Sequence, residues 1–358
     1  ACVSALFKQD KPTLHNLNAL KDTKQTIARS SHAQNTRRLL DNNPISSVSY
    51  ALATLALFDI THCTLVIDRT NWQYGCIDYN LFVLSAVWND ISIPLYWINI
   101  DNHGGNSNSL QRIDLIKWFI TNCPNITIDY LLADREFPSH DFIAWLNQNN
   151  INFIFRSKSS VVVTDNDKKV KITKLCHNIH NYPNKTKAES KVRRVYNSRL
   201  LLTIRENQHG EKVYIISNRF QHNSADIYRK RWTIEAMFAK FKTKGFNLES
   251  TRIMKSGRII SLFMFMAIAY CYACKLGEIA NNLKPSKIKA IKIKNTANTR
   301  ISKEHSIFNR GADLLKIFVD NYLSYSAVIF KQLSRILSLP PNTCIDRRLA
   351  IAKIIMIR

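Results

Sequence analysis

Residues 63–68 read CTLVID, residues 79–87 read YNLFVLSAV and residues 91–98 read ISIPLYWI. All three stretches are short, apolar and rich in β-branched or aromatic side chains, which is typical of buried β-strands. Only short gaps separate them in the chain. The sequence therefore predicts an antiparallel meander of three strands.

The elements that follow the meander indicate a fold class. We predict a helix over Leu110–Thr121, a strand over Thr127–Ala133, a helix over Ser139–Asn147 and a strand over Asn152–Arg156. Three meander strands followed by helix, strand, helix and strand is the element order of the ribonuclease-H-like fold. We therefore expect an α/β protein with a ribonuclease-H-like mixed-sheet core.

The flanking segments predict an insertion and two helical regions. Lys158–Arg194 carries ten Lys or Arg against three acids and contains β-branched runs, so we expect a basic, β-rich insertion. A helix capped by Ser224 is expected from Ala225 to at least Lys244. Asn281–Lys303, with seven Lys or Arg and no acid, is expected to be a mobile basic surface or linker. The predicted organisation is a helical N-terminal region (1–60), the first part of the core (61–157), the β-rich basic insertion (158–217), the completion of the core (218–280) and a basic, helical C-terminal region (281–358).

Composition and charge narrow the class of protein. Of the 358 residues, 46% are hydrophobic and 22% are charged, so we expect a folded protein with a sizeable core and not a disordered one. The net charge of +25 indicates a polyanionic partner, either nucleic acid or an acidic membrane surface. The longest apolar run, Ile259–Cys274, is shorter than the roughly 20 residues of a membrane span and favours a buried helix.

The cysteines predict neither a disulfide framework nor a zinc site. The eight cysteines are scattered along a long chain. Cys271 and Cys274 form a CxxC inside the apolar run, with no second pair nearby. Cys176, His177 and His180 also cluster in the sequence, but they lack a fourth ligand.

Two aspartates follow predicted strands. Asp68 comes after Thr64–Ile67, and Asp134 comes after Tyr130–Ala133. Carboxylates at the ends of adjacent central strands can meet in space and hold divalent cations through hard oxygen ligands. The alternative is that each Asp caps a neighbouring turn, where this residue is common.

Polar side chains also recur after the predicted insertion. On a continuous helix, at about 100° per residue, Tyr228, Arg231, Glu235 and Lys242 share one face. Such a face is either a solvated stripe held by ion pairs or a metal-binding carboxylate among groups that grip phosphates.

These residues resemble the signature of a known family. The spacing of Tyr, two residues, Arg, three residues, Glu, six residues and Lys resembles the YREK signature of bacterial DDE transposases of the insertion-sequence-four family. Residues 67–72 (IDRTNW) resemble the first-aspartate motif of that family, and residues 132–137 (LADREF) resemble its second. The resemblance extends from about Cys63 to Gly311.

The resemblance implies a DNA transposase with its active site on the ribonuclease-H-like core. Asp68, Asp134 and Glu235 would be catalytic and would hold two Mg²⁺ ions roughly 3.5–4 Å apart, with Mn²⁺ expected to substitute. One ion would activate the attacking oxygen and the other would stabilise the leaving 3′ oxygen, first in nicking at the element's end and then in strand transfer to target DNA. The family's DNA-contacting positions correspond to Tyr228, Arg231 and Lys242.

The roles of four further side chains, two arginines and two tryptophans, each have two possible interpretations. Arg69 and Arg135 follow the two aspartates, and we expect each either to neutralise phosphate charge or to pair with the carboxylates. Trp72 and Trp232 are either base-stacking residues or core residues.

The same resemblance suggests partners and a location. A dimer bound to double-stranded DNA, at element ends and target, is expected in the cytoplasm and associated with the nucleoid, without a membrane. Only 67 residues precede Asp68, which is short for a family whose N-terminal region recognises element ends, so a truncated N-terminal DNA-binding region is one explanation. Two other functions stay open: a transposase-derived DNA-binding protein without strand transfer, and a related DNA nuclease.

Overall fold

The structure, a computed structural model, divides the chain into two units. It describes residues 2–8, 12–14, 17, 29–74, 76–100, 107–165, 168–175, 188–206, 211–220, 223–292 and 299–319. The sheet unit comprises Ser47–Leu52 and Ile60–Ala239. The helical unit comprises Ala1–Ser46, Ala53–Asp59 and Lys240–Arg358.

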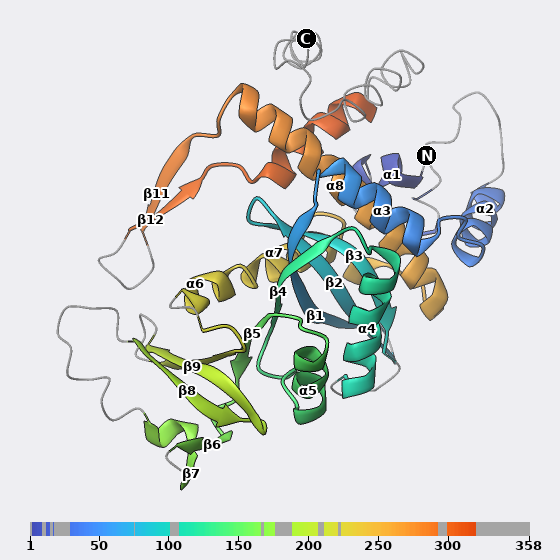
Figure 1. Cartoon of the computed structure of the whole chain (residues 1–358). Helices are drawn as coiled ribbons and strands as arrows, with labels where there is room; N and C mark the ends of the chain where they lie inside the picture. The colour runs from blue at the N-terminus through green and yellow to red at the C-terminus, as the bar shows by residue number, and fades with distance from the viewer. Residues whose placement is uncertain are drawn as a thin grey trace. The chain divides into compact units, whose positions relative to one another are not determined.

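The sheet unit is built on one mixed sheet (Figure 1). Its strand order is β3-β2-β1-β4-β5-β10-β9-β8-β6-β7. Strands β3, β2 and β1 pair antiparallel, whereas β1, β4 and β5 pair parallel. The strands are β1 (His62–Tyr74), β2 (Ile77–Trp88), β3 (Ile91–Asn99), β4 (Thr127–Ala133), β5 (Phe153–Ser157), β6 (Val162–Asp165), β7 (Lys168–Lys171), β8 (Ala188–Val195), β9 (Ser198–Glu206) and β10 (Lys212–Ser217). The predicted α/β class with a ribonuclease-H-like mixed-sheet core is confirmed.

Burial explains the central place of β1. Leu65, Val66 and Ile67 are fully buried, so the strand is covered on both faces, as parallel central strands are. The strand does not end at Asp68, as the sequence predicted, but continues to Tyr74. Beyond Asp68 it keeps its register with β2 up to the pair Tyr74↔Ile77, so the long antiparallel ladder extends it.

Two helices carry the chain across the sheet between its parallel strands. Helix α4 (Ser109–Asn122) connects β3 to β4, and α5 (His140–Gln148) connects β4 to β5. They lie side by side over the same face (Figure 1). A capping box begins α4, because the Asn108 side chain accepts a hydrogen bond from the Gln111 amide while the Gln111 side chain accepts one from the Asn108 amide. Parallel pairing of β1, β4 and β5 requires such crossovers.

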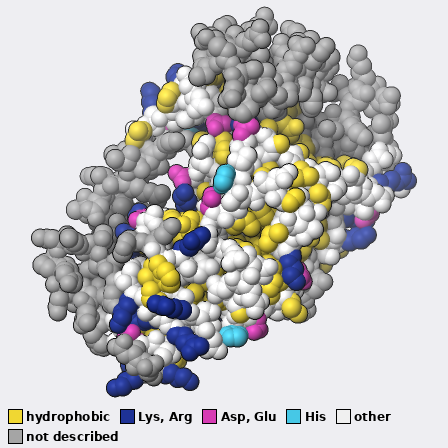
Figure 2. Space-filling model, viewed as in Figure 1, with side chains coloured by type: hydrophobic (Ala, Val, Ile, Leu, Met, Phe, Trp, Pro, Cys, Tyr) yellow, Lys and Arg dark blue, Asp and Glu magenta, His cyan; other side chains and the backbone are white. Residues whose placement is uncertain are grey.

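The β-rich insertion extends the core sheet. Strand β10 pairs antiparallel with β5, from Tyr214↔Ser157 to Ser217↔Ile154, and β9, β8, β6 and β7 follow outward. Figure 2 shows Lys and Arg side chains over this end of the sheet. Its exposed cations include Lys158, Lys168, Lys169, Lys171, Lys174, Lys191, Arg194 and Arg199.

The continuous helix predicted from Ala225 to Lys244 is wrong. The chain forms two helices, α6 (Ser224–Arg229) and α7 (Trp232–Lys242), and Asn223, not Ser224, precedes α6. Between them the Arg231 amide donates to the Tyr228 carbonyl, a three-residue spacing that tightens the turn. Arg231 therefore lies at a break, and the four polar residues do not belong to one continuous helix.

The helical unit packs around α8. Its elements are α1 (Cys2–Lys8), α2 (Arg29–Asp41), the short 3₁₀ helix η3 (Leu248–Ser250), α8 (Ser256–Leu283), the helical residues 307–319, β11 (Ile288–Lys292) and β12 (Thr299–Lys303). Helices α3 (Ser47–Leu57) and α7 cross the boundary between the two units. Within Asn281–Lys303, expected to be a mobile basic surface or linker, the described residues include the end of α8 and the antiparallel pair β11 and β12, so this part has regular structure.

Helix α8 is longer than the apolar run suggested. With 28 residues it is long and apolar enough to cross a membrane, which corrects the length argument, but 78% of its apolar window is buried inside the structure. The prediction of a buried helix is therefore confirmed. Cys271 and Cys274 are buried within it, whereas Cys176, His177 and His180 lie outside the described residues.

Two glycines allow α8 to contact the helical residues 307–319 closely. A Cβ atom added to Gly277 would collide with the Ile307 carbonyl, and one added to Gly311 would collide with the Ala273 carbonyl. The obstacles are backbone atoms, which cannot move aside as a flexible side chain can. Glycine is therefore required at both positions for this helix crossing.

We expect Gly277→Ala to lower the free energy of unfolding by about 2 kcal/mol or more, because the two helices must separate to admit the methyl group. The control is Gly257→Ala, at the start of α8, where no atom lies within 4 Å of the added Cβ. This variant should be neutral or stabilising by up to ~1 kcal/mol. Chemical denaturation measures both, and equal effects would contradict the close crossing.

Candidate active site

Asp68 and Asp134 lie side by side on adjacent parallel strands. The preceding residues, Ile67 and Ala133, are register partners in the β1–β4 pair. Neighbouring strands are about 4.8 Å apart, so the two carboxylates leave the sheet at the same level. Asp68 lies within β1, and Asp134 directly follows β4.

Arg231 joins Asp68 to Glu235. One guanidinium nitrogen, Nη1, donates to Asp68 Oδ2 at 3.1 Å, and the other, Nη2, donates to Glu235 Oε1 at 2.5 Å. The Arg231 side chain is only 7% exposed. Asp68 and Glu235, which are far apart in the sequence, are thus joined by one buried guanidinium.

Asp134 has its own partners. The Tyr228 hydroxyl donates to Asp134 Oδ1 at 3.3 Å, and Arg156 Nη1, from β5, lies 3.9 Å from the same oxygen. The guanidinium of Arg231 also lies 5.8 Å from the Tyr228 ring centroid, within cation–π range. Each carboxylate of the cluster is therefore paired with a donor. We call Asp68, Asp134, Glu235, Arg231 and Tyr228 the acid cluster.

Burial changes the proton affinities of the acid cluster. Burial, together with the charges of Asp134 and Glu136, raises the pKa of Asp68 to about 7, although the Arg231 charge and the Arg69 amide lower it in part. Burial lowers the pKa of Arg231. The hydrogen bond to Glu235 and the negative charge of Asp68 raise it by more, so the net effect is a raised pKa. Burial also raises the pKa of Tyr228, which stays a neutral hydrogen-bond donor. A buried carboxylate with a shifted pKa is typical of a functional site.

The acid cluster supplies metal-ligating oxygens without forming a metal cage as it stands. Three carboxylates are hard donors of the kind that Mg²⁺ and Mn²⁺ prefer. Among the residues that the structure describes, however, no three His, Cys, Asp or Glu side chains are arranged to hold an ion. The Arg231 guanidinium lies between Asp68 and Glu235, so the positive charge of the protein itself balances these acids.

The other residues predicted for this site separate into distinct roles. The Arg69 side chain pairs with Glu136 through two hydrogen bonds, and its amide donates to Asp68 Oδ1 at 2.8 Å. Arg135 is exposed, and within the described part of the chain it makes no hydrogen bond or ion pair. Lys242, the last residue of α7, belongs to the helical unit, where it lies 2.8 Å from Glu249.

The two tryptophans differ in environment. Trp72 is 7% exposed and stacks on Tyr79, with ring centroids 5.0 Å apart, so the core interpretation is correct for it. Trp232 is 65% exposed, so the core interpretation is wrong for it. Its ring lies 6.0 Å from the Arg231 guanidinium, at the edge of the acid cluster.

The sequence reasoning missed Arg156 and Glu136. Arg156 lies near the end of β5, the strand next to β4, and only the parallel pairing of these strands brings it toward Asp134. Glu136 is the glutamate of LADREF and entered the sequence prediction only as part of that motif. An acid two residues after a predicted catalytic Asp was the available signal.

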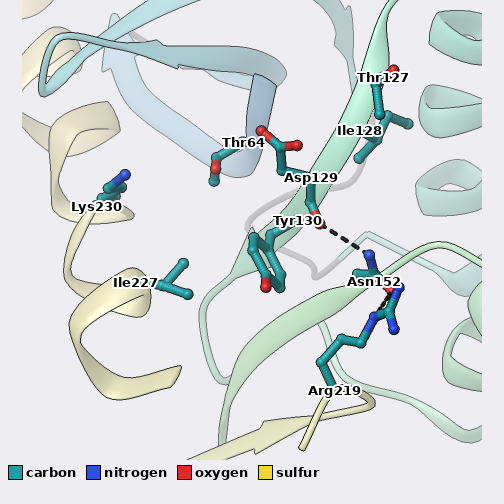
Figure 3. Close-up of a pocket in the computed structure, with 9 residues that line it drawn as sticks. All are labelled: Thr64, Thr127, Ile128, Asp129, Tyr130, Asn152, Arg219, Ile227 and Lys230. Atoms are coloured by element: carbon teal, nitrogen blue, oxygen red, sulfur yellow. Dashed lines mark hydrogen bonds between the residues drawn. The ribbon is translucent and has the colours of Figure 1, made fainter. Parts of the chain in front are cut away.

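A pocket of about 530 Å³ lies near the amino-terminal ends of the parallel strands β1 and β4. Figure 3 shows its lining residues, with Tyr130 on β4 facing Ile227 on α6. Two hydrogen bonds close one side, from Asn152 Nδ2 to the Asp129 carbonyl and from Arg219 Nε to Asn152 Oδ1. Asp129 precedes Asp134 by five residues, roughly 16 Å along a strand. Two other lining residues, Ile227 and Lys230, directly precede Tyr228 and Arg231 of the acid cluster.

One comparison with known proteins identifies a family. A family model described as "Transposase DDE domain" matches residues 60–272, more than half of the chain. Among solved structures, the chain is similar to one titled a cryo-EM structure of the piggyBac transposase synaptic complex with hairpin DNA. The identity is 11% and the TM-score 0.49, over 96% of this chain and 76% of that one. No curated protein matches the chain by sequence.

The raised pKa of Asp68 predicts a pH-dependent stability. Because the folded protein binds a proton at Asp68 up to about pH 7, whereas an unfolded Asp loses it near pH 4, this contribution to stability is lost as the pH rises. Asp68→Asn cannot ionise, so it should not lose this contribution. We expect the difference in unfolding free energy, variant minus parent, to rise by about 2 kcal/mol as the pH goes from 5 to 8. Urea denaturation across this range measures the difference. A constant difference would show that Asp68 titrates normally.

Proposed function

The chain belongs to the transposase DDE domain family, and we propose that it is the DNA transposase of an insertion sequence, cleaving at the element's ends and joining them to target DNA. The observation that carries the proposal is the acid cluster. Asp68, Asp134 and Glu235 are distant in the sequence and come together at one place on the sheet. Each corresponds to a catalytic position of the resemblance described above.

We propose that the three carboxylates bind Mg²⁺ or Mn²⁺ when the enzyme acts. Bound divalent ions would polarise the phosphodiester and lower the pKa of the attacking water or 3′ hydroxyl. The residues of the chain prepare this site. Asp68 lies on a rigid central strand, and Glu235 lies in the first turn of α7, so both donors are held by regular structure.

DNA binding is supported by the charge distribution. The net charge is +25, and the exposed cations of the insertion form a surface that can follow a phosphate backbone. We propose that Tyr228, Arg231 and Lys242 contact phosphates near the cleavage point. Tyr228 and Arg231 donate to carboxylates in this structure, so they would exchange those partners for phosphate oxygens.

The proposal extends to assembly and location. Transposition joins two ends of one element, so we propose a dimer of this chain on paired ends. Its substrate would be the nucleoid DNA of the cytoplasm. Target choice and end sequence would depend on surfaces beyond the acid cluster.

One observation favours a second candidate function, a transposase-derived protein that binds DNA without cutting it. Arg231 lies between Asp68 and Glu235, and no metal cage is assembled in the described residues. A protein held in this arrangement would occupy its DNA sites without chemistry. A related nuclease is a third candidate, separable by its products.

We expect Asp68→Asn to abolish metal-dependent nicking and strand transfer, a loss of at least about 10³-fold, while DNA affinity is kept. Asp129→Asn is the matched control, because it removes an acid from the same strand, β4, five residues before Asp134. Nicking and joining of end-containing DNA in Mg²⁺ or Mn²⁺, with a chelator control, measures the rates. Nicking by Asp68→Asn at the parent's rate would refute the catalytic assignment.

The products distinguish the three candidates. A transposase yields DNA joined to a target, a nuclease yields cut but unjoined DNA, and a DNA-binding protein yields neither. The parent protein must therefore give joined product for the proposal to stand.

Arg135 gives a prediction for DNA contact alone. Because it is exposed and follows Asp134, we expect Arg135→Gln to weaken DNA binding and to reduce the slope of log affinity against log salt by about 1. The control is Arg229→Gln on α6, whose exposed side chain already pairs with Asp226 at 3.5 Å. Fluorescence anisotropy at several salt concentrations measures both, and an unchanged slope for Arg135→Gln would exclude a phosphate contact.

A further inference from the structure

A two-bond ion pair lies behind the acid cluster. Arg69 Nε donates to Glu136 Oε1 and Arg69 Nη2 donates to Glu136 Oε2, both at 2.7 Å. Arg69 is the residue after Asp68, and Glu136 is the second residue after Asp134. The pair therefore links the β1 segment that carries one proposed catalytic acid to the turn that carries the other.

The pair faces away from the acid cluster. Successive residues of a strand point to opposite faces of the sheet, so the Arg69 side chain leaves β1 on the face opposite that of Asp68. Its register partner on β2 is Phe82. Phe82 stacks on Phe137, with ring centroids 5.5 Å apart, and thus places Phe137 on the Arg69 face. Arg69 acts from behind the strand that carries Asp68.

The turn that follows β4, from Asp134 to Phe137, is also fixed at Phe137. The Phe137 amide donates to the Asp134 carbonyl at 3.1 Å, which closes the turn. Phe137 is fully buried, and its carbonyl accepts a hydrogen bond from Arg112 Nη1 of α4 at 2.6 Å. Arg112 is itself buried and bonds to Ser107. The segment from Asp134 to Phe137 is therefore fixed in the core at Phe137, and the pair with Arg69 ties its Glu136 to β1.

The geometry of the pair makes it directional. Two parallel N–H···O bonds fix both distance and orientation, which a single contact does not. The side chains are 15% and 27% exposed, so they are only partly screened by water. Removing either partner leaves an uncompensated charge beside Asp68, whose carboxylate already senses Glu136.

We propose that Arg69 and Glu136 are positioning residues that hold Asp68 and Asp134 at the separation that DNA cleavage requires. This inference rests on the proposed transposase function and adds two residues that act through the catalytic acids. Neither touches DNA or the reacting atoms. It also separates the two arginines of the motifs, since Arg69 positions the acids while Arg135 is free to contact phosphate.

The test compares single variants with a charge exchange. We would measure the rate of the single-turnover nicking step at saturating DNA, and DNA affinity by anisotropy, for Arg69→Gln, Glu136→Gln and the double variant Arg69→Glu with Glu136→Arg. Each single variant should lose about 10- to 100-fold in rate, with affinity within about threefold of the parent, because the acids are displaced. The double variant should recover at least about tenfold over the slower single variant. Arg229→Gln on α6 is the matched control, because its exposed side chain pairs with Asp226 at 3.5 Å, and it should keep both the rate and the affinity of the parent.

Rescue and the split between rate and affinity decide the inference. A simple loss of stability would lower the amount of folded protein without changing the rate per folded molecule, and thermal melting corrects for it. If the single variants fail to fold, Arg69→Lys replaces them, since it keeps the charge but loses the two-bond geometry, and it should still be at least about tenfold slower. Loss of affinity with an unchanged rate for Arg69→Gln, or a double variant no faster than the singles, would overturn the proposal.

A second readout does not need cleavage. Amide hydrogen exchange at residues 134–137 should accelerate in the single variants and return toward the parent's rate in the double variant. If the parent fails to cut DNA while the exchange pattern holds, the proposed function fails and the link between the two segments stands. If the parent cuts DNA and the exchange pattern is absent, only the positioning inference fails.

Discussion

Parallel pairing of β1 with β4 places Asp68 and Asp134 at one level, and the rest of the site is arranged around that constraint. The register Ile67↔Ala133 brings two like charges within the spacing of neighbouring strands, in a region where burial already disfavours charge. The structure offsets this in two ways. On one face Arg231 binds Asp68 while Tyr228 binds Asp134, and on the other face Arg69 binds Glu136. The sheet can keep both acids only because these donors accompany them.

The core could be predicted from sequence because its strands and helices are locally consistent. The boundaries of β4 follow from a short stretch of mostly β-branched, aromatic and apolar residues between a proline-containing loop and Asp134. The end of β1 was not visible in the same way, because Arg69–Tyr74 looks like a polar loop until the ladder with β2 is known. Strand β8, in which four of eight residues are charged, likewise depends on its partner β9.

The acid cluster was predictable in membership but not in arrangement. The spacing of Tyr228, Arg231 and Glu235 was sufficient to select these residues, yet the assumption of one straight helix gave the wrong geometry. Neither proline nor glycine occurs at the break, Lys230 and Arg231, so the local sequence does not predict it. It is favoured by tertiary contacts, since a buried guanidinium with two carboxylate partners outweighs the lost helical hydrogen bonds. Sequence spacing alone carries no information about such a preference.

The insertion joins the core through β10, which shares a continuous ladder of hydrogen bonds with β5. A domain joined by two flexible linkers would rotate independently of the core, whereas an insertion that continues the core sheet moves together with it. A load applied to the outer strands would be transmitted as torque to β5, the strand that carries Arg156 beside Asp134. A polyanion held by the basic outer strands would thus be mechanically coupled to the carboxylates at the centre of the sheet.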